Sequence, residues 1–412
     1  MHSRIGAAVV AFTVIILAGC SGTPQSNLAP GTGSLTPSLQ SRPALPNRHA
    51  RPLWTETVLY SFADSPDGAI PGDTMTDVNG TLYGTTRFGG SGTGTVFSIT
   101  PSGTYSLLHT FGGSGQPKVP FAGLTSVNVT LFGTTTRGGT HNEGTVYKIT
   151  GSGAARVLYS FAGGSDAAVP YSGLTNVRGT LYGTSTQGGA NGAGTVFKIT
   201  KKGTETVLYS FAGGTDGAGP SSGLTNVNGT LYGTTQSGGT GCGSSGCGTV
   251  FSITTSGMYR QLHSFADGPT DGATPVYGSL NNVNGRLYGT TSSGGANGFG
   301  TVFSIKASSG AYSLLYSFGN SPDGETPVAG LTNVGNTLYG TTYYGGASGS
   351  GAVFSVTTSG TETVLYSFAG SPDGANPAGG LTNVNGTLYG TTELGGTGGS
   401  SGGIGTVYSL SP

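Results

Sequence analysis

The chain has 412 residues, of which 81 are glycine and only 8% are charged. Its 16 basic and 16 acidic side chains cancel and no cluster of Lys or Arg occurs, which argues against nucleic acid or an acidic membrane surface as a partner. Because the glycines recur at fixed places between short apolar segments, the composition does not indicate a disordered low-complexity chain.

Residues 1–19 have the pattern of a secretory signal peptide. A basic start is followed by an apolar stretch over residues 5–17, which is too short to span a membrane comfortably, and then by small residues. Leu-Ala-Gly-Cys, ending at Cys20, resembles a bacterial lipobox, which implies cleavage before Cys20 and a lipid on its thiol. Ser21 resembles the sorting pattern for the outer membrane of a two-membrane bacterium. The alternative is an ordinary signal peptide with an incidental cysteine.

Residues 20–54 are expected to form a disordered tether that starts at the lipidated Cys20. The segment is rich in Pro, Ser, Thr, Gly and Asn and has almost no large apolar side chains, so it cannot bury enough surface to fold. A flexible coil of this length reaches about 30 Å. We therefore expect an exported body held clear of the lipid headgroups, with the outer membrane as its location.

Residues 55–412 consist of a tandem repeat. Leu-Tyr-Gly-Thr, once with Phe in place of Tyr, recurs in seven copies separated by 49 to 56 residues. The copies start at Leu82, Leu131, Leu181, Leu231, Leu287, Leu338 and Leu388. Repeats of this length are typical of propeller blades or solenoid coils.

Each copy contains four segments of strand length that are rich in β-branched and aromatic residues. In the third copy these strands, here named a to d, are residues 172–177, 180–184, 195–200 and 205–211. An Asn-Gly pair between a and b predicts a two-residue type I′ turn, and a short Ser-Gly turn joins c to d. The longer b–c and d–a links fall at one rim, which we call the loop-bearing rim and expect to carry most of the exposed chemistry.

The d–a links share a proline and, in six copies, an aspartate. We expect each proline at the first residue of strand a, where its missing N–H breaks no ladder bond. The aspartates are Asp67, Asp166, Asp216, Asp271, Asp323 and Asp373. A ring of carboxylates is a candidate cation site, but Asp-Gly is also a usual turn pair and a ring does not converge on one point, so we expect turns.

The repeat begins and ends out of phase. Its first element, residues 57–62, is a d strand, and its last, residues 406–410, is a c strand. If these two pair, no blade is left incomplete, whereas an open solenoid would need polar caps that neither end shows. The sequence therefore predicts an all-β fold: a seven-bladed β-propeller with four antiparallel strands per blade, closed by pairing of the first repeat strand with the C-terminal strand.

The repeat unit also resembles a known family. Gly-Leu-Thr-Asn-Val-Asn-Gly-Thr-Leu-Tyr-Gly-Thr-Thr, followed by Gly-Thr-Val-Phe-Ser-Ile-Thr and Val-Leu-Tyr-Ser-Phe, is similar to the GloVer (Gloeo/Verruco) tandem repeat of bacterial surface proteins over residues 55–412. The resemblance implies a propeller-like body attached to the cell by an anchor, and it implies no catalytic residues. Kelch repeats are similar in length but repeat a Trp, and the single Trp of this chain is Trp54, ahead of the repeats.

Cys242 and Cys247 flank Gly-Ser-Ser-Gly in the b–c link of the fourth copy. In an oxidising exported compartment this pair predicts a disulfide across the loop. A zinc site is the alternative, but it would need two further Cys or His ligands and none is near in the sequence. We expect no metal and no cofactor.

The second copy departs most from the repeat. Its b–c link carries Arg137, His141 and Glu143, and its d–a link carries Lys118. His141 and Glu143 are a candidate acid–base pair for an extracellular enzyme acting on carbohydrate or a related polymer. Exposed loops also vary freely, so sequence drift is the alternative.

Bulky side chains in the links of other copies could stack on sugar rings or on a partner protein, and the alternative is that they fold over the blade edges. They are Phe88, Phe299, Tyr343, Tyr344 and Leu394. The leading hypothesis is a monomeric, non-enzymatic, lipid-anchored envelope protein that binds a glycan or a surface protein through the loop-bearing rim. The rivals are the second-copy enzyme and a structural surface-layer component.

Overall fold

The computed structural model describes residues 54–399 and 403–412. The predicted signal peptide, Cys20 and the tether up to residue 53 lie outside the described residues. In the described part of the chain the regular elements are β-strands and two short 3-10 helices, Gly214–Asp216 and Gly243–Ser245. No helix there is long and apolar enough to cross a membrane.

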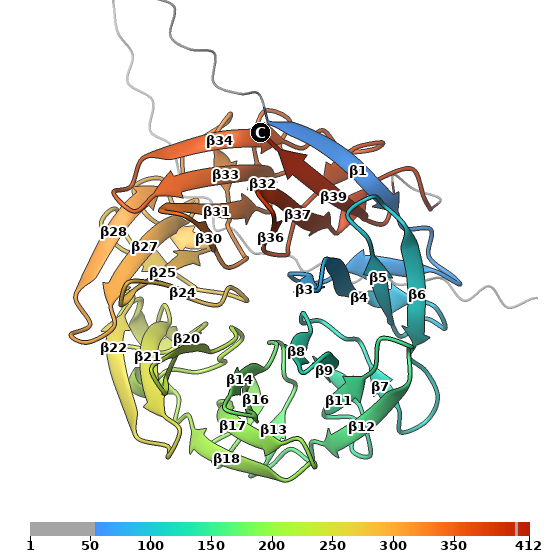
Figure 1. Ribbon diagram of the computed structural model, residues 1–412. Helices are drawn as coiled ribbons and strands as arrows, with labels where there is room; N and C mark the ends of the chain where they lie inside the picture. Colours follow the sequence, from blue (N-terminus) through green and yellow to red (C-terminus); the bar gives the residue numbers. More distant parts are fainter. Residues whose placement is uncertain (1–53, 400–402) are drawn as a thin grey trace, which may run out of the picture. The chain divides into compact units, whose positions relative to one another are not determined.

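Seven antiparallel sheets surround a central axis (Figure 1), each with the four strands per blade that the sequence predicts, and a fifth strand joins the sheet of blade 1. From the innermost strand outward, blade 1 is β3 (Thr76–Val78), β4 (Thr81–Gly89), β5 (Thr95–Ile99) and β6 (Tyr105–Thr110); blade 2 is β8 (Thr125–Val127), β9 (Thr130–Thr135), β11 (Thr145–Ile149) and β12 (Ala155–Ser160); blade 3 is β14 (Thr175–Val177), β15 (Thr180–Ser185), β17 (Thr195–Thr200) and β18 (Glu205–Ser210); blade 4 is β19 (Thr225–Val227), β20 (Thr230–Thr235), β21 (Thr249–Thr254) and β22 (Tyr259–Ser264); blade 5 is β24 (Asn281–Val283), β25 (Arg286–Thr291), β27 (Thr301–Lys306) and β28 (Tyr312–Ser317); blade 6 is β30 (Thr332–Val334), β31 (Thr337–Thr342), β33 (Ala352–Thr357) and β34 (Glu362–Ser367).

Blade 7 joins the two ends of the repeat region. It consists of β36 (Thr382–Val384), β37 (Thr387–Thr392), β39 (Thr406–Ser411) and, as its outermost strand, β1 (Thr55–Ser61). The register places Thr55 opposite Ser411 and Ser61 opposite Thr406. A bulge in this pairing matches the one between strands c and d of the other blades, so β1 replaces the missing d strand and the predicted closure is confirmed.

Short additional strands, which the sequence did not predict, tie the d–a link to the b–c link of the same blade. They pair as β7 (Pro117–Lys118) with β10 (Arg137–Gly138), β13 (Ala167–Ala168) with β16 (Gln187–Gly188), β23 (Gly272–Ala273) with β26 (Ser293–Gly294), β29 (Gly324–Glu325) with β32 (Tyr344–Gly345), and β35 (Gly374–Ala375) with β38 (Leu394–Gly395). In blade 1, β2 (Gly68–Pro71) pairs with the long β4, and in blade 4 a single bridge joins Ala218 to Ser237. The loop-bearing rim is therefore held by backbone hydrogen bonds.

A ring of hydrogen bonds links each innermost strand to the next blade. The first side chain of the strand donates to the carbonyl of the residue that precedes the next innermost strand. The bonds run Thr76 to Leu124, Thr125 to Leu174, Thr175 to Leu224, Thr225 to Leu280, Asn281 to Leu331, Thr332 to Leu381 and Thr382 to Met75. The last of these crosses from blade 7 to blade 1, so the ring is complete. This pattern gives the repeated Gly-Leu-Thr its physical role.

The glycine of Leu-Tyr-Gly-Thr is required by the aromatic residue opposite it on strand c. Gly183 pairs with Phe197, and a Cβ on Gly183 would lie 2.6 Å from Cζ of Phe197 and 3.0 Å from Cδ2 of Leu174. Phe197 itself is fully buried in a cluster that joins blades 2 and 3. The core thus lies between neighbouring blades, and the glycine leaves space for the ring that fills it.

The predicted position of the prolines was wrong. Strand β8 begins at Thr125, five residues after Pro120. A Cβ on Gly94 would lie 2.6 Å from Cδ of Pro120, so the proline ring packs against the glycine that precedes strand c of the preceding blade. Pro170 meets Gly144 in the same way. The prolines therefore serve contact between blades rather than the start of a strand.

The aspartates of the d–a links bind their own turn and the preceding strand d. Asp166 accepts hydrogen bonds from the Tyr159 hydroxyl at 3.0 Å and from the Ala162 N–H at 2.8 Å. Asp216, Asp323 and Asp373 make the equivalent pair of bonds. These contacts agree with the expected turn role.

Three glutamates at the outer edges of the blades face such an aspartate. The pairs are Glu56 with Asp373, Glu205 with Asp166 and Glu362 with Asp323. Burial, and secondly the charge of the aspartate, raises the pKa of each glutamate from 4.5 to about 7. Because this pKa lies above the unfolded value, the stability that the protonated carboxyls contribute is complete below pH 4.5 and is lost as the pH rises through about 7.

Replacing the three glutamates should change how stability depends on pH. The triple variant Glu56→Gln, Glu205→Gln, Glu362→Gln cannot ionise at these positions, so its melting temperature should fall less than that of the wild type between pH 5 and pH 8. Thermal unfolding at the two pH values measures the difference. The exposed Asp64→Asn is the control and should leave the wild-type pH dependence unchanged. Parallel curves for the wild type and the triple variant would contradict the assignment.

Candidate ligand-binding site

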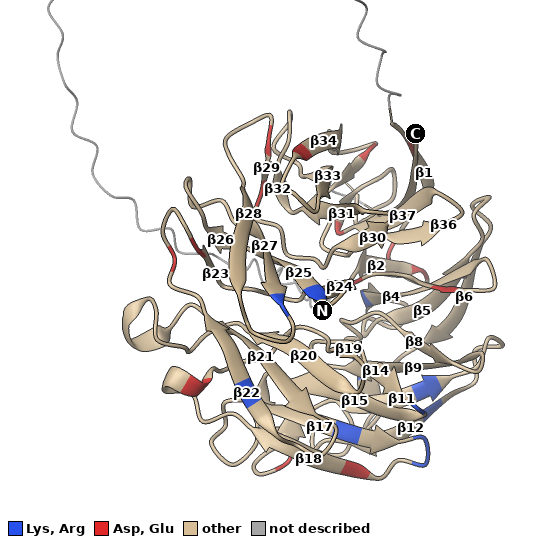
Figure 2. Cartoon of the chain, turned by 60° about the vertical axis from the view of Figure 1, so that its left-hand side comes forward, with Lys and Arg blue, Asp and Glu red and all other residues tan. Residues whose placement is uncertain are grey.

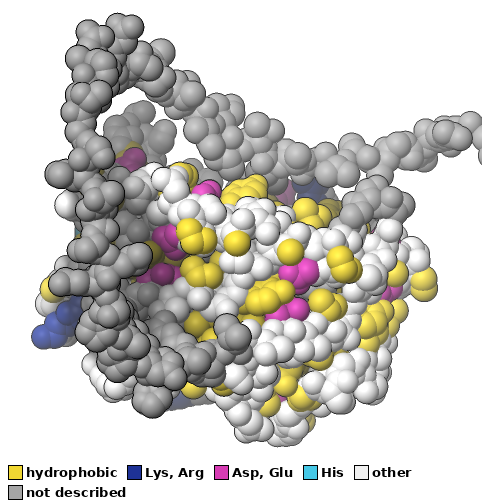
Figure 3. Space-filling view, turned by 90° about the horizontal axis from the view of Figure 1, so that it is seen from above, with side chains coloured by type: hydrophobic (Ala, Val, Ile, Leu, Met, Phe, Trp, Pro, Cys, Tyr) yellow, Lys and Arg dark blue, Asp and Glu magenta, His cyan; other side chains and the backbone are white. Residues whose placement is uncertain are grey.

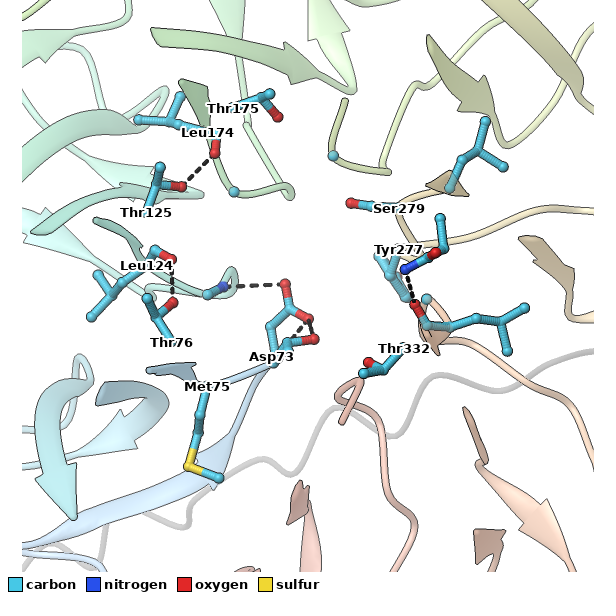
Figure 4. Close-up of a pocket in the computed structure, with 18 residues that line it drawn as sticks. Asp73, Met75, Thr76, Leu124, Thr125, Leu174, Thr175, Tyr277, Ser279 and Thr332 are labelled. Carbon is cyan, nitrogen blue, oxygen red and sulfur yellow. Dashed lines mark hydrogen bonds between the residues drawn. The ribbon is translucent and has the colours of Figure 1, made fainter. Parts of the chain in front are cut away.

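A cavity of about 310 Å3 lies at the loop-bearing end of the central channel. Residues just before and at the start of the innermost strands of blades 1 to 6 line it (Figure 4). Its wall alternates apolar side chains such as Leu124 and Leu174 with hydroxyl groups such as Thr125 and Ser279. We call it the axial cavity. It offers both polar and apolar contacts to a small molecule.

Asp73 is the charged residue that lines the axial cavity. Its Oδ1 accepts a hydrogen bond from the Thr74 N–H at 2.6 Å, and its Oδ2 accepts one from the Gly123 N–H of blade 2 at 3.1 Å. In Figure 4 its carboxylate points into the opening, with Tyr277 and Ser279 on the opposite side. Burial raises the pKa of Asp73, and the two backbone hydrogen bonds oppose this shift. The backbone of two blades thus holds one carboxyl group in place.

Asp73 has no acidic counterpart in the other blades. The residues at the same repeat position are Ala122, Ser172, Ser222, Gly278, Ala329 and Gly379. A buried carboxylate costs free energy unless it is paired. The fold is built six times without this group, so the blade itself does not require a carboxylate at this position.

Aromatic rings from three blades meet beside the axial cavity. The Phe121 ring lies 4.9 Å from that of Tyr171 and 5.0 Å from that of Tyr277, measured between centroids. The Arg87 guanidinium lies 3.7 Å from the centroid of Phe121. We call Phe121, Tyr171, Tyr277 and Arg87 the axial cluster. Cation–π and edge-to-face contacts of this kind hold the rings in fixed positions.

Arg87 also pairs with Glu393 of blade 7 across the closure of the ring. Arg87 Nη1 lies 2.5 Å from Glu393 Oε1, and only 15% and 12% of the two side chains are exposed. The Tyr343 hydroxyl of blade 6 donates to Glu393 Oε2 at 2.8 Å, and burial raises the pKa of Tyr343. Arg87, Glu393 and Tyr343 occupy the same repeat position, directly after Thr-Thr. Blades 6, 7 and 1 are therefore joined by side chains at the rim.

The next repeat position is exposed and apolar on these same three blades. Phe88 of blade 1, Tyr344 of blade 6 and Leu394 of blade 7 are 45%, 47% and 43% exposed. The other blades carry polar residues there, namely Arg137, Gln187, Ser237 and Ser293. We call Tyr344, Leu394 and Phe88 the apolar arc. Apolar side chains exposed together on neighbouring elements are typical of an interaction surface.

The site predicted on blade 2 is open to solvent. Lys118 and Arg137 lie opposite each other on β7 and β10, His141 is exposed and Glu143 is half-buried. Within residues 54–399 and 403–412 no hydrogen bond or ion pair joins His141 to Glu143, so their catalytic role stays a prediction. Phe299 packs against a buried cluster between blades 5 and 6, which leaves it only partly available to a ligand.

The two cysteines of blade 4 are joined. The Cα atoms of Cys242 and Cys247 lie 5.5 Å apart, within the usual range for a disulfide. The Asp267 carboxylate and both sulfurs lie within 4.8 Å of one another, the arrangement that a metal site would need. Bonded sulfurs are not thiolate ligands, so this geometry does not favour the zinc alternative.

Sequence reasoning missed Asp73, Arg87, Phe121, Tyr277 and Glu393 as a group. Each lies at a link position where the residue varies among the copies, which was a usable signal. The sequence did not reveal which departures meet, because the meeting depends on how far each link reaches toward the axis.

Charge does not mark a binding face. Figure 2 shows Lys, Arg, Asp and Glu on most blades, with Lys and Arg side by side near β11 and β12, where Lys148 pairs with Arg156. The side seen in Figure 3 has hydrophobic side chains interspersed with acidic ones. A ligand recognised mainly by its charge is therefore not favoured.

A family model described as the Gloeobacter/Verrucomicrobia repeat matches residues 51–244 and 240–412. No curated protein matches the chain. A crystal structure of the tricorn protease is similar to 78% of this chain, with a TM-score of 0.42 and 12% sequence identity, and the chain spans only 27% of the protease chain. A likeness this distant carries no argument about function. Because the family model matches the whole repeat region, the chain belongs to the Gloeobacter/Verrucomicrobia repeat family.

Proposed function

We propose that this protein is a non-enzymatic binding module that is anchored to a bacterial envelope by a lipid on Cys20 and binds a polysaccharide through the loop-bearing rim. The observation that carries the proposal is the apolar arc. Phe88 and Tyr344 are aromatic and nearly half exposed, and polar residues take their place on blades 2 to 5. Aromatic faces beside hydroxyl and amide groups suit sugar rings, which present both C–H faces and hydroxyls.

A polysaccharide fits this surface better than a charged polymer. Only 8% of the residues are charged, with no net charge, and the ion pair nearest the arc, Arg87 with Glu393, is internally neutralised. Three adjacent blades present equivalent positions, so successive sugar units could each occupy a weak site. When one sugar unit is bound, the next unit of the same polymer is held at a high local concentration, so several weak sites together give a higher overall affinity.

Removing the aromatic faces should weaken binding strongly without unfolding the ring. The full-length protein in detergent is incubated with insoluble cellulose, chitin, xylan and starch, and bound protein is measured by depletion of the supernatant. The wild type should bind at least one polymer, and the double variant Phe88→Ala, Tyr344→Ala should bind it at least tenfold more weakly.

The matched control uses the same repeat position on other blades. Gln187→Ala with Ser293→Ala changes blades 3 and 5 and should leave the affinity unchanged. A wild type that binds none of the four polymers, or equal losses in the two double variants, would refute the assignment to the apolar arc.

The anchor is tested separately. Cys20→Ser should move the protein from the membrane fraction to the soluble fraction and should prevent labelling by radioactive palmitate. A variant that still sediments with membranes and still takes up label would show that Cys20 is not the attachment site.

A further inference from the structure

We infer that the axial cavity binds a single neutral sugar residue, with Asp73 as the residue that hydrogen-bonds its hydroxyl groups. The inference rests on the proposed function, because the sugar would be the terminal unit of the polysaccharide on the rim. The protein would then have two sites for one polysaccharide. The apolar arc binds the middle of the polysaccharide, and the axial cavity binds its terminal sugar.

The size of the cavity limits the ligand to one unit. Its volume of about 310 Å3 lies at the lower end of the range of about 300–1,000 Å3 for small-molecule pockets. The cavity is formed by the loop-bearing ends of the innermost strands, the end of the channel that carries the apolar arc. To occupy the cavity, the polymer terminus has to enter past Phe121, Tyr171 and Tyr277, whose rings meet beside the cavity.

The two walls of the cavity offer complementary contacts. On one side Asp73 Oδ2 accepts one hydrogen bond, from the Gly123 N–H, and keeps a lone pair for a ligand hydroxyl. Its Oδ1 already accepts bonds from the N–H and the hydroxyl of Thr74. On the other side Tyr277 presents an aromatic ring that Phe121 packs against. A carboxylate facing an aromatic ring can hold the hydroxyl edge and the C–H face of one sugar at the same time.

The wall also accepts further hydroxyl groups. The Thr76, Thr125 and Thr175 hydroxyls donate their protons to leucine carbonyls, which leaves their oxygens as acceptors toward the cavity. No Lys or Arg lines the cavity, and Asp73 supplies the one carboxyl group. Arg87 lies close enough for its charge to act on Asp73, but it is paired with Glu393. An acidic sugar would therefore meet the carboxylate without a free cationic partner, so the site favours neutral sugars.

Asp73 is dispensable for the blade fold, because Ala, Ser or Gly fills its place in the other blades. A structural role is the rival explanation, since its bond to Gly123 joins blade 1 to blade 2. The two roles differ in what Asp73→Asn does. The amide keeps one carbonyl acceptor for a backbone N–H but loses the charge-assisted bonds to hydroxyl groups.

The test titrates the full-length protein with glucose, galactose, mannose, N-acetylglucosamine and glucuronic acid by calorimetry at millimolar concentrations. At least one neutral sugar should bind to the wild type, and glucuronic acid should not. Asp73→Asn should weaken the binding at least tenfold and lower the melting temperature only slightly, because the amide nitrogen cannot accept one of the two backbone N–H bonds. Gln187→Ala with Ser293→Ala, which changes neither the cavity nor the apolar arc, should leave it unchanged.

The results separate this inference from the proposed function. Monosaccharide binding that Asp73→Asn removes, in a protein that binds no polymer, would support the axial site and refute the rim. Polymer binding that depends on Phe88 and Tyr344, with no response to any neutral monosaccharide or no effect of Asp73→Asn, would support the rim and overturn the axial site. If the monosaccharide that binds the cavity displaces the polymer, the natural ligand of the cavity is the end of the polysaccharide. If it does not displace the polymer, the natural ligand is a free sugar.

Discussion

Deleting residues 55–62 should lower the melting temperature by more than 15 °C or prevent folding. The deletion removes β1, so β39 loses the partner that occupies its outer edge. It also removes Phe62, which is fully buried in a cluster shared by blades 7 and 1, and Tyr60, whose ring stacks 3.9 Å from that of Tyr105. An unpaired strand edge with an exposed core invites aggregation. Thermal unfolding by circular dichroism measures the loss.

Deletion of residues 21–50 is the matched control and should change the melting temperature little. If the deletion of 55–62 yields no folded protein, Phe62→Ala gives the quantitative test, since removing a buried Phe costs about 3–5 kcal/mol. Phe211 is the equivalent residue of blade 3, is equally buried and packs against blade 4. Phe62→Ala and Phe211→Ala should cost the same in a closed ring, and a far smaller cost at Phe62 would indicate an open one.

Replacing Gly183 by Val should destabilise the protein by several kcal/mol, because side chains forced into a packed core typically cost about 1–3 kcal/mol and Val adds two branches. The Cβ alone would already lie 2.6 Å from the Phe197 ring and 3.0 Å from Leu174. The ring cannot withdraw, since Phe197 is fully enclosed between blades 2 and 3. Chemical denaturation measures the change in the free energy of unfolding.

Two variants keep this prediction specific. Gly151→Ala adds a Cβ whose nearest neighbour is the Tyr83 hydroxyl at 3.6 Å, and it should be close to neutral. Gly183→Ala combined with Phe197→Leu shortens the facing side chain and should recover part of the stability lost in Gly183→Ala alone. Additive costs in the double variant would mean that the glycine is needed for a reason other than space for the ring.

Local pattern and the phase of the repeat were enough to predict the architecture. Strand lengths follow from the β-branched and aromatic segments, and Asn228 and Gly229 both have the positive φ of the predicted type I′ turn. The closure followed from finding a d strand first and a c strand last. The strands and turns depend on neighbouring residues, and the closure follows from counting the strands of the repeat. A single sequence is enough for both.

The rim could not be predicted in the same way. Two-residue strands such as β7 and β10 are too short to give a periodic signal, and Pro120 was misplaced because its partner, Gly94, belongs to another blade. Arg87 and Glu393 lie at opposite ends of the repeat region and meet only because the ring closes. The candidate site depends on such long-range contacts. They can be predicted from the sequence only once the topology of the fold is known.

The arc, the ion pair between Arg87 and Glu393, and one bond of the inner hydrogen-bond ring all cross the junction between blades 7 and 1. The most direct measurement of that junction is a disulfide between Thr57→Cys and Ser409→Cys, residues that pair directly across β1 and β39. Under mild oxidation, peptide mapping should find the two positions linked within one molecule, whereas Thr57→Cys with Ser313→Cys on β28 should not link. An absent bond between positions 57 and 409, or one that forms only between molecules, would contradict the closed ring and the site built across it.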